Sequence, residues 1–122
     1  MKIVEVATAP TRRAPMPDGP TVRPLLGPDS GAPVAVLHMT LRVGGRVPEH
    51  DHGPSHVVLF PLQGRVRLHH DGNDHDLGPG TVTHIGVGER VSLANPGPDP
   101  VELVVVAAPP DFAAALSAWP SA

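Results

Sequence analysis

The sequence predicts an all-β protein made of short strands joined by tight turns. Glycine and proline are abundant, with 13 glycines and 17 prolines among 122 residues, and they interrupt the chain at short intervals. Hydrophobic residues make up 40% of the chain and occur in short runs rich in valine and leucine. Such runs, bounded by turn residues, are typical of strands and exclude a helical bundle. A chain of this length forms one domain around one core.

The strands are expected in a regular order along the chain. Residues 1–6 alternate weakly and predict a short edge strand, whereas residues 9–20 are rich in proline and predict an extended arm. Further strands are expected over residues 21–26, 34–43, 56–62, 65–69, 81–85, 91–94 and 101–107. In 65–69, charged residues alternate with Val66 and Leu68, so these two side chains are expected to face the core.

A short helix is expected after the last strand. Pro109 and Pro110 end the sheet, and Asp111 predicts an N-cap. Phe112, Leu116 and Trp119 then recur at helical spacing. This helix is therefore expected to dock its apolar side on the outside of the domain.

Composition excludes several classes of function. Without cysteine there is no disulfide, no thiolate nucleophile and no cysteine-ligated metal, so any metal must be held by His, Asp or Glu. No nucleic-acid partner is expected, because the nine basic residues are dispersed, the net charge is −3 and few aromatic side chains are present. No membrane partner is expected either, because the longest apolar stretch, 103–108, is far shorter than the roughly 20 residues that span a bilayer. Residues 1–6 lack the apolar core of a secretory signal, which favours a cytoplasmic location.

Three of the eight histidines, His50, His52 and His56, lie within seven positions. In an extended strand these positions share one face, so their imidazoles could converge on one interior point. Imidazole is a common ligand of zinc, iron, copper and nickel, and the cluster therefore predicts a metal site with open positions. The alternative is a hydrophilic surface loop, because polar, glycine and proline residues surround the three histidines.

The spacing around this cluster resembles the first motif of the cupin superfamily. Gly44, five residues, His50-Asp51-His52, three residues, His56 and a final Gly64 fit the frame of that motif. The family motif has a glutamate after the histidine pair. Counted forward from His52, this glutamate position holds His56, and counted back from Gly64 it holds Val57. We favour His56, because it shares the parity of the pair and can coordinate a metal, whereas valine cannot.

A second cupin motif is recognisable by its ends. Pro79-Gly80-Thr81 and Asn95-Pro96-Gly97 match these ends, and Gly86 stands at the inner proline. Val91 occupies the position of the family's metal-binding histidine. His84 is a candidate substitute, since it would face inward if Val82 does; the alternative is a histidine at the rim or the surface.

The resemblance covers roughly residues 34–107 and implies a small antiparallel double-stranded β-helix, the jelly-roll barrel of RmlC-like cupins. We expect one domain over residues 1–122: an N-terminal strand and arm in 1–33, the barrel in 34–107, and a C-terminal helix and tail in 108–122. The barrel interior would hold a metal and a small molecule. Val58, Phe60, Leu62, Val66, Leu68, Val91 and Leu93 are expected to line it.

The resemblance also implies a metal centre. His50, His52, His56 and His84 would hold a divalent transition metal, and these ligands leave open whether it is Fe, Zn, Ni, Cu or Mn. The function implied is a dioxygenase-like oxidoreductase acting on a small molecule. The alternative is a non-catalytic ligand-binding or sensor cupin with a structural metal or none.

Two further expectations concern partners. Arg42, Arg65, Arg67 and Arg90 could clamp a substrate carboxylate, or they could be solvated charges on the strand faces. Small cupins commonly pair through an edge strand, so a homodimer is expected.

Overall fold

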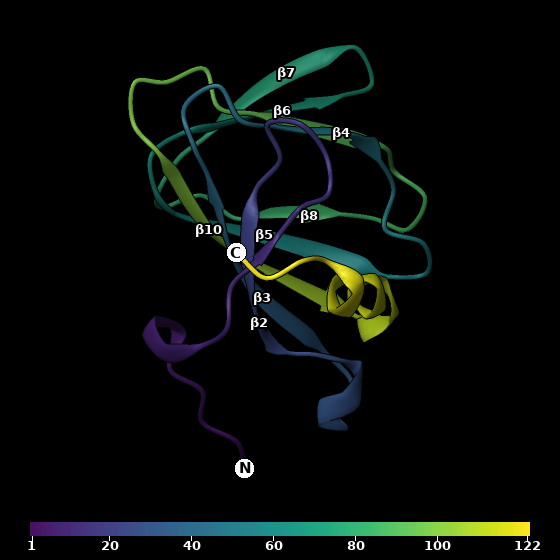
Figure 1. Ribbon diagram of the computed structural model, residues 1–122. Coiled ribbons are helices and arrows are strands. Elements are labelled where there is room, and N and C mark those ends of the chain that lie inside the picture. Colours follow the sequence, from purple (N-terminus) through teal and green to yellow (C-terminus); the bar gives the residue numbers. More distant parts are fainter.

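The computed structural model describes all residues, 1–122, as two antiparallel sheets packed face to face (Figure 1). The six-stranded sheet has the order β1 (Arg12–Arg13), β2 (Thr21–Leu26), β3 (Ala35–Leu41), β10 (Val101–Ala108), β5 (His56–Gln63) and β8 (Thr83–Ile85). The four-stranded sheet has the order β4 (Arg46–His50), β9 (Val91–Ala94), β6 (Val66–His70) and β7 (Asn73–Leu77). The all-β prediction is confirmed.

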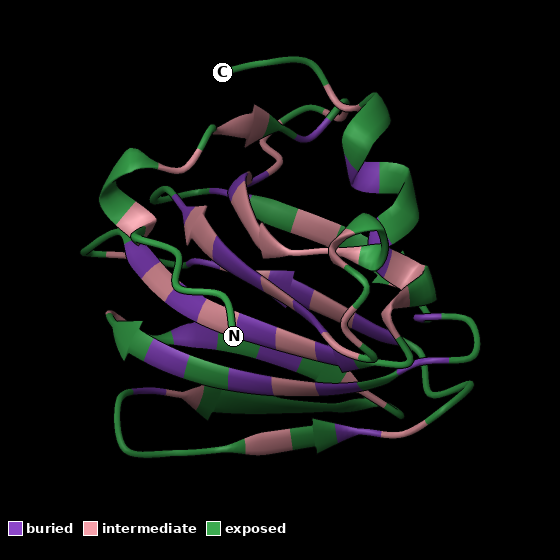
Figure 2. Cartoon of the chain, turned by 90° about the horizontal axis from the view of Figure 1, so that it is seen from below, coloured by how far each residue is buried: buried purple, intermediate pink, exposed green.

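The core lies between the two sheets because their strands alternate in burial. Along β10 every second residue from Val101 to Ala107 is buried, and the residues between them are partly exposed. Figure 2 shows strands along which buried residues alternate with more exposed ones. Val66 and Leu68 on the facing sheet are buried as predicted. One continuous apolar core therefore joins both sheets.

The chain departs from the predicted elements at several points. Residues 1–5 form no strand, and the N-terminal region instead contributes the 3₁₀ turn η1 (Val6–Thr8) and the two-residue strand β1. Strands β4 and β7 were not predicted, because their residues are mostly polar and lie exposed at the surface. A second 3₁₀ turn, η2 (Pro28–Ser30), precedes β3. None of the helical segments is long and apolar enough to cross a bilayer.

The predicted C-terminal helix is the 3₁₀ helix η3 (Pro110–Ala118). Its N-cap is Pro109 and no side chain caps it, so the predicted capping role of Asp111 is wrong. The segment after η3 is fastened to the N-terminal arm: the Arg13 amide donates to the Pro120 carbonyl over 2.8 Å, and the Ala122 amide donates to the Thr11 carbonyl over 3.0 Å. The arm and the C-terminal segment (residues 109–122) are thus tied to each other.

Strand β5 presents the opposite face from the one predicted. Val57 and Leu59 are buried, whereas Phe60 and Leu62 are 41% and 55% exposed. Residues 57–62 are apolar at both parities, so alternation could not distinguish the inner face from the outer one. The expectation that Val58, Phe60 and Leu62 line the interior is wrong.

Two of the motif residues have a structural role. Gly64 follows β5 with φ of +75°, and a Cβ atom there would lie 2.4 Å from the Pro100 carbonyl oxygen. Asn95 is buried; its side-chain amide donates to the Leu41 carbonyl over 3.0 Å and to the Asp99 carbonyl over 2.9 Å, and its oxygen accepts from the Gly97 amide. Both residues hold turns at the ends of core strands.

Candidate functional site

The space between the sheets contains a cavity of about 390 Å³. Its walls are mainly apolar side chains from both sheets: Val22, Leu37, Met39, Val47, Leu59, Ile85, Val91, Leu93 and Val105. Residues outside the sheets complete the lining, with Met16 and Pro20 from the arm and Phe112, Leu116 and Trp119 from the C-terminal segment. The helix predicted to dock on the outside therefore turns its apolar side chains into the cavity.

Two of the predicted histidines lie together in the wall of this cavity. His50 is the last residue of β4, and His52 lies in the loop that follows. The Nδ1 atom of His50 is 2.7 Å from the Pro48 carbonyl oxygen, and its Nε2 atom is 3.1 Å from Nε2 of His52. Because a carbonyl oxygen only accepts, His50 donates from Nδ1, and its Nε2 in the neutral ring carries a free lone pair. Nε2 of His50 is therefore an acceptor.

His52 is buried, with 6% of its surface exposed. Its Nδ1 atom is buried without a hydrogen-bond partner, and the ring packs edge-on against Phe112 with centroids 5.1 Å apart. Desolvation by burial lowers the pKa of His52 from 6.5 to about 4; the charge of His50 also lowers it, and Asp51 opposes the shift. The His52 ring is therefore neutral near pH 7.

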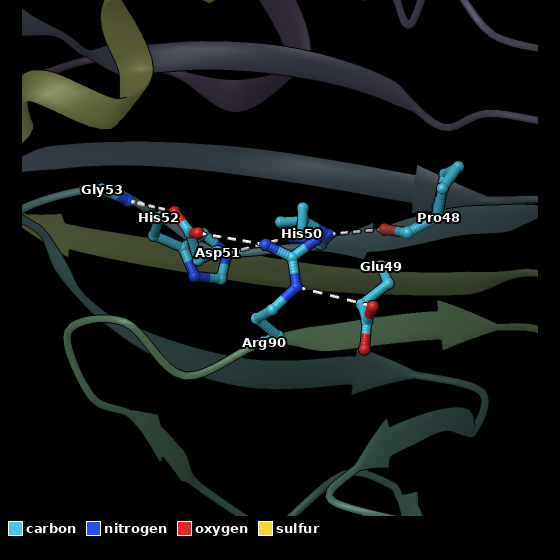
Figure 3. Close-up of polar contacts among 7 residues, drawn as sticks. All are labelled: Pro48, Glu49, His50, Asp51, His52, Gly53 and Arg90. Carbon is cyan, nitrogen blue, oxygen red and sulfur yellow. Dashed lines mark hydrogen bonds and ion pairs between the residues drawn. The ribbon is translucent and has the colours of Figure 1, made fainter.

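An ion-pair cluster lies beside the two histidines (Figure 3). Arg90 Nε is 3.5 Å from Glu49 Oε2, and its Nη1 is 3.3 Å from Asp51 Oδ2. Asp51 also accepts a hydrogen bond from the Gly53 amide over 2.9 Å. Glu49 and Asp51 both contribute to the cavity lining, whereas Arg90 does not. The guanidinium is thus paired with two carboxylates beside the cavity.

The other two predicted ligands lie elsewhere. His56 and His84 are exposed and pair with each other, with His56 Nδ1 3.0 Å from His84 Nε2 and the rings stacked. His84 lies opposite Val58 in the β5–β8 pairing, and the buried residue beside His56 is Val57. The prediction that His56 and His84 point inward with His50 and His52 is wrong. The parity argument failed because residues 51–55 form a turn and not a continuous strand.

The donor set does not fit a resident metal. The two Nε2 atoms are close enough to bind one ion, but zinc sites in proteins use three or four protein ligands. The other two positions at which the cupin motifs place a metal ligand hold valines, Val57 and Val91. Both valines are buried, and Val91 lies opposite His50 in the β4–β9 pairing. No group of three His, Asp or Glu side chains has an arrangement that would hold a metal ion.

Comparison with known proteins gives the family. A model of the cupin domain family matches residues 37–107, more than half of the chain. The chain is a cupin. No curated protein matches this cupin.

Solved structures share the fold of this cupin. A predicted oxalate decarboxylase from Thermotoga maritima superposes with a TM-score of 0.78 at 21% identity, covering 88% of this chain and 98% of that one. The polyketide cyclase RemF from Streptomyces resistomycificus gives a TM-score of 0.78 at 23% identity, covering 88% and 79%. A Cupin 2 conserved barrel domain protein from Salinispora arenicola gives 0.75 at 20% identity, covering 97% of each chain. These similarities confirm the cupin double-stranded β-helix.

Proposed function

We propose that this cupin binds one small molecule inside its barrel, with the His50–His52 pair contacting the polar part of that molecule. The observation that carries the proposal is the cavity of about 390 Å³ that the two sheets, the arm and the C-terminal segment line together. Ligand sites in proteins commonly occupy about 300–1,000 Å³ and combine apolar walls with a few polar groups. The cavity has this size and this composition.

The alternative is a metal-dependent oxidoreductase of the dioxygenase type. It needs more ligands than the two imidazoles in the cavity wall, so the binding function has the better support. We expect elemental analysis to find far less than one transition metal per chain, with the same content in a His50→Ala/His52→Ala variant. Close to one metal per chain, lost in that variant, would favour the oxidoreductase instead.

Binding in the cavity is tested directly with an uncharged solvatochromic dye. We expect saturable binding to the wild type with a blue-shifted emission, because the dye moves from water to an apolar environment. Val47→Phe places a larger side chain in the cavity lining and should weaken binding at least about tenfold. Val82→Phe is the matched control, because Val82 is 62% exposed and lies outside the cavity. No saturable binding, or equal loss in both variants, would refute the proposal.

A further inference from the structure

We infer that the molecule bound in this barrel is an uncharged aromatic alcohol of about two fused rings, whose hydroxyl donates a hydrogen bond to the His50–His52 pair. The inference rests on the proposed function and adds the chemical class of the ligand. Three features of the cavity carry it: its charges, its unpaired acceptors and its aromatic and thioether lining.

The charges around the cavity disfavour an anionic ligand. The ionisable side chains in the lining are His50, His52 and the carboxylates Glu49 and Asp51. Arg90, which lies beside these residues, is already paired with both carboxylates. A ligand carboxylate would thus leave water for an apolar cavity without a free cation to pair with, and burial of an unpaired charge is costly. This separates the chain from a protein that takes a dicarboxylate such as oxalate.

The histidine pair has more acceptors than donors. His50 donates its Nδ1 proton to the Pro48 carbonyl, so its Nε2 atom is an acceptor. If His52 donates from Nε2 to His50, its own Nδ1 is a buried acceptor without a partner. If His52 carries its proton on Nδ1 instead, that buried N–H has no acceptor, and the two Nε2 lone pairs face each other across 3.1 Å. A ligand hydroxyl that reaches the Nε2 atoms donates to one of these lone pairs in the second tautomer, whereas an added acceptor there has no donor to meet.

The size and lining of the cavity favour an aromatic ring system. An apolar cavity of about 150 Å³ holds one benzene, so about 390 Å³ accommodates two fused rings. Phe112 and Trp119 provide aromatic surface, and the thioethers of Met16 and Met39 make favourable contacts with aromatic rings. A flat, apolar molecule with one hydroxyl group matches all three features.

The test uses three ligands of nearly equal shape, measured by titration calorimetry on the full chain at pH 7. They are 2-naphthol, which carries a donor; 2-methoxynaphthalene, which does not; and 2-naphthoate, which is charged. We expect 2-naphthol to bind about five- to tenfold more tightly than 2-methoxynaphthalene, which corresponds to one net hydrogen bond. Binding of 2-naphthoate should be at least about 30-fold weaker than that of 2-naphthol, because its charge is unpaired.

A His50→Leu variant should remove the preference for 2-naphthol over 2-methoxynaphthalene. The matched control is His75→Leu, because His75 is exposed on β7 and lies outside the cavity. The comparison of ligands on the wild type does not depend on whether the variant folds. Equal binding of 2-naphthol and 2-methoxynaphthalene would overturn the role of the donor, and tighter binding of 2-naphthoate would overturn the assignment of an uncharged ligand.

The solvatochromic dye separates failure of this inference from failure of the proposed function. If the dye binds in the cavity and none of the three naphthalenes does, the ligand class is wrong and the binding function stands. If the dye does not bind either, the proposed function is wrong and the ligand class falls with it.

Discussion

At the scale of single residues, burial of the His52 ring controls its charge. The ring has no carboxylate partner, and its pKa is lowered to about 4, chiefly by desolvation. The unfolded chain, by contrast, binds a proton at this residue near pH 6.5. Between these two values the unfolded state holds a proton that the folded state does not, so acid favours unfolding.

This difference predicts a loss of stability as the pH falls from 6.5 towards 4. By pH 4.5 the contribution of His52 to the free energy of unfolding should have dropped by up to about 2–3 kcal/mol. Urea denaturation at pH 7.5 and pH 4.5 measures the change, and His52→Gln should reduce it by that amount. An equal pH dependence in the variant and the wild type would contradict the assignment.

Gly64 predicts a second effect at the scale of a single residue. Gly64 and Gly72 have φ of +75° and +78°, but only at Gly64 would a Cβ atom meet the backbone, 2.4 Å from the Pro100 carbonyl oxygen. Gly72→Ala should cost about 1–2 kcal/mol through its backbone conformation alone. We expect Gly64→Ala to cost at least about 2 kcal/mol more, measured by urea denaturation, because the turn after β5 must move away from Pro100. Equal losses would show that the close approach is relieved without cost.

At the scale of elements, the start of η3 is fixed to the loop that carries His52. Ser55 is fully buried, and its hydroxyl donates to the Pro109 carbonyl over 2.6 Å. The same oxygen lies 3.4 Å from the Phe112 amide, which donates to it. Ser55 therefore positions both the start of η3 and the Phe112 ring that packs on His52.

Removal of this hydroxyl should loosen the C-terminal segment. We expect Ser55→Ala to cost about 1–2 kcal/mol of stability and to speed hydrogen–deuterium exchange over residues 110–118. The control is Ser117→Ala, because Ser117 is exposed on η3 and its hydroxyl donates only to the Ala114 carbonyl. Unchanged exchange in Ser55→Ala would mean that apolar packing alone holds η3 in place.

The elements also show where sequence reasoning reaches its limit. The strands around Val66, Val91 and Val101 were predictable, because their apolar runs are bounded by turn residues. The inward face of β5 was not predictable, since its residues are apolar on both sides. The histidine cluster shows a related limit. His50 and His52 were correctly predicted to lie together, but the alternation of side-chain faces along a strand is lost in the turn before His56.

At the scale of the whole molecule, the cavity depends on segments that are distant in sequence. The sequence predicts the barrel through local motifs that recur in the cupin family. It does not predict that Met16, Phe112 and Trp119 reach the same cavity, because contacts between an arm and a C-terminal segment leave no periodic signal.

The homodimer stays a prediction. Light scattering, which gives the mass of the protein in solution, is the measurement that tests it.

Occupation of the cavity should stabilise the entire fold. A ligand that binds only the folded state at 100 times its Kd adds about 2.7 kcal/mol to the free energy of unfolding. We expect thermal unfolding of the wild type to shift upward with increasing dye concentration. The shift should be much smaller in Val47→Phe at the same concentrations, and a shift of the same size in both proteins would place the dye outside the barrel.

The C-terminal segment lies outside the strand ladder of the barrel, yet it provides Phe112, Leu116 and Trp119 to the cavity wall. Substitutions in this segment can therefore change the shape of the cavity without changing the strand pairing of β2 to β10. We expect exchange of residues 109–122 between related barrels to change which small molecule the cavity accepts while the barrel stays the same.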